Sequence, residues 1–436
     1  NLGKDGCMTS YKTWLKDMMD YRVKQRQYSD VAKYDVYLDK KYKEFMIENK
    51  KTVMYLVKEF EMKKSAQAYK RASQDKTGII DPLKLPTYKY NEDIFKKLTI
   101  IPDGKNHGMM MLLDWSGSMS DVLFNTVKQL INLVEFCRKV NIPYEVYFFT
   151  SERDYDQRDS LKGWSNNPGE WSMECFHLVN SLSHRMTKKE ADLAMKMMYH
   201  MGLYFDNRYS YRRHDVYDSE EYEAQSNNWG IPNKYYLGNT PLNESLLYMN
   251  KLIPLYKKKY GIEKFTFITL TDGSGNYPRG KIIGKEKTED DYEKSNVYDL
   301  DGSKFVRRHG NITEDILNHI KKKHNSNVIG FYIIKRVRRY DLERYITNYK
   351  DWNDKQNILA KMRKEMTKEK AVVVDAEGYH KFFLLDGKKL GIENFDMNTA
   401  EIKKGTTSEL KRVFGKSMAN RLISRVVLNK FIQEVA

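Results

Sequence analysis

The chain has 436 residues, more than one domain of ordinary size and fewer than three, since a domain usually holds about 100–200 residues. Its 76 Lys and Arg residues exceed its 59 Asp and Glu residues, so the formal net charge is +17. No apolar run approaches the roughly 18 residues that cross a bilayer, no signal peptide opens the chain, and its 3 scattered cysteines exclude a disulfide framework or a zinc site. We therefore expect a cytoplasmic protein that does not contact a membrane.

Residues 1–105 predict a basic helical region with an extended linker. Residues 8–73 have helical periodicity, and within Thr52–Ser73 the apolar side chains recur mostly at three- and four-residue steps. Thr77–Tyr90 then contains one glycine and two prolines, which favour an extended segment that leads into the next domain.

From residue 106, short apolar runs alternate with helical periods. Continuous apolar runs of this kind are typical of strands that are covered on both faces. The predicted strands are Met109–Asp114, Tyr144–Thr150, Phe176–Ser181 (at a sheet edge), Phe265–Thr271, Asn327–Ile334 and Val372–Asp375. The predicted helices are Asp121–Val140, Thr187–Met201, Leu242–Tyr260 and Ile312–His324. Strands separated by helices predict an α/β fold with a doubly wound, mostly parallel sheet over residues 106–375.

Two polar insertions and a C-terminal segment complete the predicted organisation. Residues 204–236 and 276–310 show no sustained period, so we interpret them as loops or hairpins on the rim of the sheet. Ser408–Val435 has a strong amphipathic pattern, which predicts one or two helices in a C-terminal segment over residues 376–436.

Oxygen-bearing side chains lie at the ends of several predicted elements. An Asp and two Ser alternate on a glycine-containing turn after the first strand, a Thr precedes a helix, and a second Asp follows a later strand. These residues are Asp114, Ser116, Ser118, Thr240 and Asp272. In a doubly wound sheet the carboxyl ends of the strands meet in one crevice, where ligands bind. We therefore expect the five side chains to face one spot, although the Asp and Ser residues could also merely cap helices and turns.

Two carboxylates and three hydroxyls, without sulfur or imidazole, are ligands for a hard divalent cation. Oxygen donors of this kind predict Mg²⁺ or Mn²⁺ rather than zinc. These side chains do not fill the coordination sphere of the cation, so water or a carboxylate from another molecule can occupy the remaining positions.

Asp114-Trp115-Ser116-Gly117-Ser118, together with Thr240 and Asp272, resembles the metal-ion-dependent adhesion site (MIDAS) of von Willebrand factor type A (VWA) domains. The resemblance implies that this quintet of side chains holds the cation, and that the cation bridges the domain to an acidic residue of its ligand. It implies a protein-binding role, with no catalysis by this chain on its own.

A narrower resemblance covers roughly residues 50–375. Thr77-Gly78-Ile79-Ile80-Asp81, Lys84-Leu85 and the Tyr88–Lys97 stretch look like the VWA subunit of aerobic cobaltochelatase (CobT-type), and closer still to its homologues encoded by large tailed phages. Such subunits work with a MoxR/CobS-type AAA+ ATPase, so the resemblance implies that partner in a remodelling or metal-chelatase-type complex. The two insertions depart from the family pattern.

The sequence contains no complete motif of an independent catalytic site. Gly275–Lys281 matches the start of a phosphate-binding loop, but Ile282 replaces the Ser or Thr that would hold Mg²⁺, so we interpret it as a loop. His319 and His324 are five residues apart and do not share a helical face as a zinc peptidase pair must. We expect the histidines to be surface or hydrogen-bonded core residues.

The positive charge lies in the flanks. Residues 1–105 hold 23 basic and 15 acidic side chains and residues 355–436 hold 17 and 10, which leaves 36 and 34 in between. Tyr209–His214 and Lys335–Tyr340 interleave aromatic and cationic residues as nucleic-acid platforms do. Acidic residues follow the first run directly, however, and the second can simply open a solvated helix.

Three functions therefore stay open at this point. The first is a cation-dependent adaptor for the AAA+ ATPase, in the host cytoplasm if the protein is phage-encoded. The second is the non-catalytic subunit of a true cobalt or magnesium chelatase. The third, less favoured, is a nucleic-acid-binding or virion structural protein.

Overall fold

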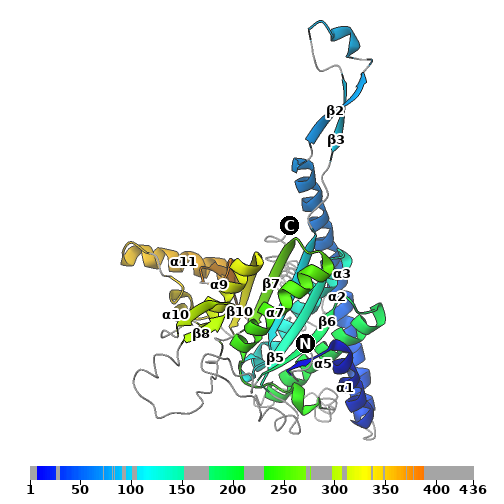
Figure 1. The fold of residues 1–436 in the computed structure, drawn as a ribbon. Helices are drawn as coiled ribbons and strands as arrows, with labels where there is room; N and C mark the ends of the chain where they lie inside the picture. Colours follow the sequence, from blue (N-terminus) through cyan, green and yellow to red (C-terminus); the bar gives the residue numbers. More distant parts are fainter. Residues whose placement is uncertain are drawn as a thin grey trace, which may run out of the picture.

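A sheet of eight strands lies at the centre of the computed structural model (Figure 1). The structure describes residues 7–25, 30–71, 73–80, 82, 84–90, 95–100, 106–151, 176–210, 230–271, 275, 297–306, 312–334, 337–346, 349–369, 371–376 and 378–386. The strands of the sheet are β1 (Met8–Thr9), β4 (His107–Asp114), β5 (Tyr144–Thr150), β6 (His177–Ser183), β7 (Lys264–Thr271), β10 (Ser326–Ile334), β11 (Ala371–Val374) and β12 (Lys381–Asp386).

The strands follow the order β1-β6-β5-β4-β7-β10-β12-β11 across the sheet. Neighbours are parallel except that β6 runs antiparallel to β5 and β11 antiparallel to β12. Successive side chains of β4 alternate between two hydrophobic clusters: Met109 and Met111 join one, and Met110 and Leu112 the other. The sheet is therefore buried on both faces, which explains the continuous apolar runs of its strands.

Helices cover both faces of the sheet. The first face is covered by α1 (Tyr11–Gln25), α3 (Leu123–Lys139) and α5 (Lys188–Ser210), and α2 (Asp30–Arg71) packs on the outer side of α3 and α5. The second face is covered by α7 (Leu242–Tyr260) and α9 (Ile312–His324), with α10 (Arg339–Glu343) and α11 (Trp352–Glu369) beside β11 and β12. The predicted α/β fold with a doubly wound, mostly parallel sheet is confirmed. Within the described residues, no helix combines the length and apolar composition that a membrane span requires.

Several elements differ from the predicted ones. The strand predicted at the edge, β6, lies one place inside it, because β1 pairs with its outer side. α5 continues to Ser210, so the first insertion begins as helix. β12 and α11 were not predicted, and Lys381–Asp386 places a strand where a helical C-terminal segment was expected. Ser408–Val435 lies outside the described residues.

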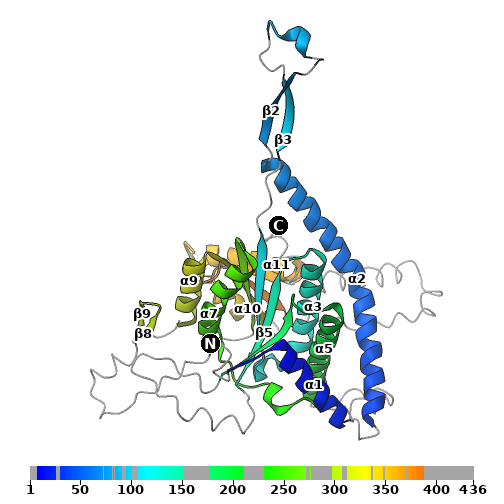
Figure 2. The same cartoon turned by 45° about the vertical axis from the view of Figure 1, so that its right-hand side comes forward.

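The predicted N-terminal region divides into a part that packs on the sheet and a part that projects from it. β1 and α1 add to the sheet and its first face, whereas the 42-residue α2 runs from that face into an arm (Figures 1 and 2). At the end of the arm, β2 (Ser73–Ile80) and β3 (Phe95–Ile100) form an antiparallel hairpin. A 3-10 turn, η1 (Leu85–Thr87), lies between them. The chain then enters β4 at its amino end, so the arm joins the sheet at the end opposite Asp114.

A polar cluster joins the second insertion to the second face. β8 (Val297–Leu300) and β9 (Ser303–Val306) form a hairpin. The sequence predicted either loops or hairpins for this insertion. At its turn, Asp301 accepts a hydrogen bond from Asn250 of α7 at 2.7 Å and pairs with His319 and Lys323 of α9. His324 is buried, and its Nε2 lies 2.7 Å from Asn250 Oδ1, which confirms a hydrogen-bonded core histidine.

The buried His324 makes stability depend on pH. Burial, with a smaller contribution from Lys323, lowers its pKa from 6.5 to about 4. Between these two values the unfolded chain takes up a proton that the folded chain does not, so stability is lost as pH falls through that window. We expect the free energy of unfolding in urea to fall from pH 6.5 to 4, and to fall less steeply in His324→Gln. The pKa of His380 is lowered too, so some slope remains in the variant. Identical slopes for both proteins would refute this assignment.

Candidate metal centre

The sheet changes its winding direction at β4. From β4 the chain passes through α3 on the first face to β5, and it later passes through α7 on the second face to β7, on the other side of β4. Such a switch point opens a crevice at the carboxyl ends of the strands, and ligands of doubly wound proteins bind there. Asp114 ends β4 and Thr271 ends β7, so these two residues border the crevice.

Asp114 is fully buried, and both of its carboxylate oxygens are held in place. Oδ1 accepts a hydrogen bond from the backbone N–H of Ser116 at 3.0 Å, which closes the turn after β4. Oδ2 accepts one from the Thr271 hydroxyl at 2.6 Å, which ties the ends of β4 and β7 together. The carboxylate is therefore oriented by the turn and by the neighbouring strand.

The two serines have the spacing of neighbouring metal ligands. Ser116 Oγ and Ser118 Oγ are hydrogen-bonded to each other at 3.0 Å. Adjacent ligands of an octahedral Mg²⁺ ion with bonds of about 2.1 Å are separated by about 3.0 Å, the bond length times √2. Ser116 stands at the N-cap of the 3-10 helix η2 (Gly117–Asp121), yet its side chain makes no capping hydrogen bond. The spacing of the two hydroxyls is therefore compatible with a small hard cation, and the Ser116 side chain does not cap η2.

The loop that carries Thr240 lies against this turn. The N–H of Gly117 donates to the carbonyl of Gly238 at 2.8 Å, and the N–H of Gly238 donates to the carbonyl of Trp115 at 3.3 Å. Ser116 and Gly238 form a parallel bridge through these bonds. Thr240 follows two residues later, half-buried and just ahead of α7.

The end of β5 also forms hydrogen bonds with the Thr240 loop. The Thr150 hydroxyl donates to the carbonyl of Tyr236 at 2.9 Å, and Ser151 Oγ accepts a hydrogen bond from the N–H of Asn239 at 2.8 Å. A Cβ atom at Gly238 would collide with the Ser151 hydroxyl and lie 2.9 Å from the Ser151 backbone nitrogen, so glycine permits this close approach.

Trp115 anchors the turn after β4 in the hydrophobic core. It is fully buried and packs on Phe148 with ring centroids 4.9 Å apart, and its indole N–H donates to the carbonyl of Tyr235 at 2.9 Å. Met119 is also buried, so both residues pack in the core.

Asp272, the fifth predicted ligand, lies outside the described residues. The residues on both sides of residues 272–274 border the site: Thr271 bonds to Asp114, and a Cβ at Gly275 would lie 3.0 Å from Leu242 and 3.1 Å from the Asn243 amide, in the first turn of α7. The structure therefore brings Asp114, Ser116 and Ser118 together and places the Thr240 loop beside them.

The site is open on one side. Asp114 and Ser116 are buried, whereas Gly117, Ser118 and Asn239 are exposed at its rim. The described residues contain no group of three or more His, Cys, Asp or Glu placed to hold a metal ion. A cation at this turn would thus depend on hydroxyl ligands as well as carboxylates, with one side accessible to another molecule.

The hydrogen bonds between the end of β5 and the Thr240 loop predict an effect on metal affinity. In Ser151→Ala the Asn239 N–H loses its acceptor, so the loop is less well positioned. Outer groups that orient metal ligands change affinity by 10–100-fold, and we expect Mn²⁺ affinity to fall by about 10-fold, measured by calorimetric titration. Ser10→Ala, at an exposed serine before α1, serves as the control and should bind Mn²⁺ like the native protein. Equal affinities for all three proteins would contradict the role of Ser151.

Comparisons with known proteins supply no family for the chain. No family model and no curated protein matches it. Among solved structures, the pilus adhesin SpaC from Lactobacillus rhamnosus GG in its open conformation matches with 12% identity and a TM-score of 0.29, over 61% of this chain and 30% of the adhesin. Proximal thread matrix protein 1 from the mussel byssus matches with 12% identity and a TM-score of 0.27, over 62% of this chain and 49% of that protein. The chain covers less than half of either structure, and at these scores the similarity carries no conclusion.

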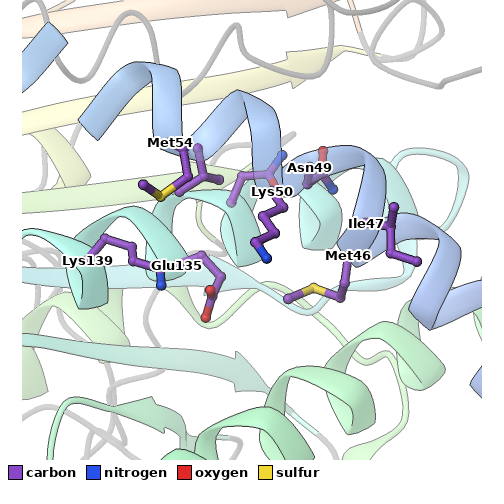
Figure 3. Close-up of a pocket in the computed structure, with 9 residues that line it drawn as sticks. Met46, Ile47, Asn49, Lys50, Met54, Glu135 and Lys139 are labelled. Carbon is purple, nitrogen blue, oxygen red and sulfur yellow. The ribbon is translucent and has the colours of Figure 1, made fainter. Parts of the chain in front are cut away.

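A cavity of about 260 Å³ lies elsewhere, between α2 and α3 (Figure 3). Met46, Lys50 and Met54 of α2 face Glu135 and Lys139 of α3 across it. It is smaller than the roughly 300–1,000 Å³ of small-molecule sites and contains none of the predicted metal ligands. We assign no function to it.

Sequence reasoning did not find Thr271, Thr150 and Ser151, which position Asp114 and the Thr240 loop. Their residue types are common at strand ends, and only the register of the sheet brings them to the site. Of the phosphate-loop-like stretch Gly275–Lys281, only Gly275 lies within the described residues.

Proposed function

We propose that this chain is a divalent-cation-dependent adaptor of the VWA type. Asp114, Ser116, Ser118, Thr240 and Asp272 would hold Mg²⁺ or Mn²⁺ at the switch point of the sheet. The cation would supply an electrophilic centre with a coordination position open to an acidic side chain of another protein. The chain's own residues orient the ligands and leave the rim accessible.

One observation carries this proposal: a turn with two hydroxyls 3.0 Å apart lies at the switch point beside the Thr240 loop. The turn follows β4, the strand with Asp114 at its end, and Thr271 joins that carboxylate to β7. A helix cap would need none of these cross-strand contacts.

The partner in this proposal is an AAA+ ATPase of the MoxR/CobS type. The support is the sequence resemblance to CobT-type subunits. The residues of this chain that carry the resemblance lie in the arm and at the proposed cation ligands. Thr77–Ile80 lies in β2, Lys84-Leu85 at η1, and Phe95–Lys97 in β3. The resemblance therefore includes the projecting arm as well as the cation ligands.

The direct test is complex formation with the AAA+ ATPase encoded nearest to this chain's gene. Purified proteins are mixed in Mg²⁺, and the complex is measured by size-exclusion chromatography. We expect a complex with the native chain, and its loss in EDTA or in Asp114→Ala with the circular dichroism spectrum unchanged. Survival of the complex under both conditions would refute the adaptor function. The matched control Asp121→Ala, at an exposed carboxylate at the end of η2, should leave the complex intact.

A further inference from the structure

An exposed aromatic and cationic surface lies on α10 and α11, away from the side chains of the proposed metal site. Tyr340 is 54% exposed, Tyr349 47% and Trp352 65%, large values for aromatic side chains. Lys355 Nζ lies 5.0 Å from the centroid of the Tyr349 ring and 5.9 Å from that of Trp352, close enough for cation–π attraction to both. The two rings and the ammonium group form one platform at the start of α11.

A row of cationic side chains continues from this platform along α11. Residues 360, 363, 364, 367 and 368 are spaced i, i+3, i+4, i+7 and i+8, so they share one helix face. They are Ala360, Arg363, Lys364, Thr367 and Lys368, all of them exposed, and they line an open concavity of about 650 Å³. Trp352 lies eight residues before Ala360, so the row starts at the platform.

The acidic side chains near the platform are engaged within the helices. Asp341 accepts a hydrogen bond from the Arg338 N–H at 2.7 Å, and Asp354 accepts one from the Lys350 N–H at 3.0 Å. Glu343 pairs with Arg339 at 2.6 Å. Between residues 355 and 368 the chain has five basic side chains and one acidic one, the half-buried Glu365. The surface therefore keeps a net positive charge.

We propose that this α11 surface, made of Tyr349, Trp352, Lys355, Arg363, Lys364 and Lys368, binds single-stranded nucleic acid. Bases stack on the Tyr349 and Trp352 rings, as they do on aromatic platforms, and the backbone phosphates follow the cationic row. From residue 352 to residue 368 the helix rises about 24 Å, long enough to contact several nucleotides of a single strand.

Exposed indole and phenol rings beside a cationic row favour a nucleic acid over an acidic protein segment. Every base presents a flat π face that can stack on these rings, whereas carboxylate side chains gain nothing from a second aromatic ring. α11 lies at the β12–β11 end of the sheet and extends outward in Figure 1, so a strand can reach the row along its length. The site needs no bound cation, and its failure would leave the proposed adaptor function unaffected.

The experiment uses the full chain and a fluorescein-labelled 20-nucleotide oligothymidylate, with anisotropy measured between 50 and 200 mM salt. We expect binding that weakens with salt. Tyr349→Ala/Trp352→Ala should weaken it by about 5-fold or more for each base that loses its stacking partner, and Trp352→Phe should retain most of the affinity. Lys364→Glu/Lys368→Glu should weaken binding and make the log–log salt slope shallower by about 1.4, the contribution of two phosphate contacts.

The matched control is Lys251→Glu/Lys258→Glu, which makes the same charge change at two exposed positions of α7 and should bind like the native chain apart from a small uniform loss. Polyglutamate of similar charge serves as a competitor. The proposal fails if the oligonucleotide does not bind at 50 mM salt. It fails equally if the aromatic variants bind normally while polyglutamate competes fully, the outcome expected for an acidic protein partner, or if the α7 control loses as much affinity as the α11 variant.

Discussion

Gly238→Ala should disable the candidate metal centre, whereas Gly117→Ala, in the turn after β4 that is hydrogen-bonded to Gly238, should not. A Cβ at Gly238 would collide with the Ser151 hydroxyl and lie 2.9 Å from both the Ser151 nitrogen and Thr150 Oγ1. Because the Ser151 nitrogen belongs to the backbone at the end of β5, the Thr240 loop must shift instead. We expect a loss of about 1–3 kcal/mol in stability, as for overpacked sites, and a loss of more than about 10-fold in Mn²⁺ affinity.

The control substitution adds the same methyl group in open space. A Cβ at Gly117 would meet only the carbonyl of Gly238, at 3.8 Å, an ordinary van der Waals distance. Gly117→Ala should therefore change stability by about 0.5 kcal/mol or less and keep its Mn²⁺ affinity. Urea unfolding and calorimetric titration of both variants measure the two effects. Equal Mn²⁺ affinities for Gly238→Ala and Gly117→Ala would show that the Thr240 loop is no part of the site.

Asp114→Asn should abolish stabilisation by Mg²⁺ without unfolding the protein. The asparagine keeps a carbonyl oxygen for the Ser116 N–H, and its amide can donate to the Thr271 hydroxyl, so the turn and the β4–β7 contact can persist. The negative charge that attracts the cation is lost. A ligand at one hundred times its Kd stabilises the native state by about 2.7 kcal/mol, and we expect this gain in the native chain and none in the variant.

Thermal unfolding in Mg²⁺ and in EDTA checks this expectation. The native chain should unfold at a higher temperature in Mg²⁺, and Asp114→Asn at the same temperature in both. Asp121→Asn, at an exposed carboxylate of η2, controls for nonspecific binding of Mg²⁺ to surface charge and should respond like the native chain. An undiminished Mg²⁺ response in Asp114→Asn would rule out Asp114 as a ligand.

The elements that could be predicted from the sequence are those with local signals. α7 has its predicted bounds because a helical apolar period runs up to Tyr260, where Gly261 follows in the left-handed conformation with φ +59° and ends the helix. β5 is a continuous apolar run and also has its predicted bounds. In these segments local propensity and burial agree.

Other elements depend on partners that are distant in sequence. β1 has two residues and exists as a strand because it pairs with β6, some 170 positions further on. α11 has few fully buried apolar residues, among them Leu359 and Met366, so its apolar period is weak. β12 follows soon after β11 and pairs with both β10 and β11, an arrangement that no local pattern encodes.

The candidate site shows the same division. Asp114, Ser116, Ser118 and Thr240 could be selected from sequence because their oxygen atoms follow or precede predicted elements in a distinctive order. The atoms that hold these side chains in place could not be predicted. The Thr271–Asp114 and Ser151–Asn239 hydrogen bonds depend on the register between strands, which the sequence does not show.

The central claim is that the turn after β4 holds one divalent cation through hydroxyl ligands. Electron paramagnetic resonance of Mn²⁺ titrated into the metal-free protein measures bound and free ion directly. We expect one tight Mn²⁺ ion per native chain, displaced by excess Mg²⁺, and its loss in Ser116→Ala/Ser118→Ala, whose two methyl groups cannot coordinate a metal. A double variant that binds Mn²⁺ with the native stoichiometry and affinity would contradict the claim.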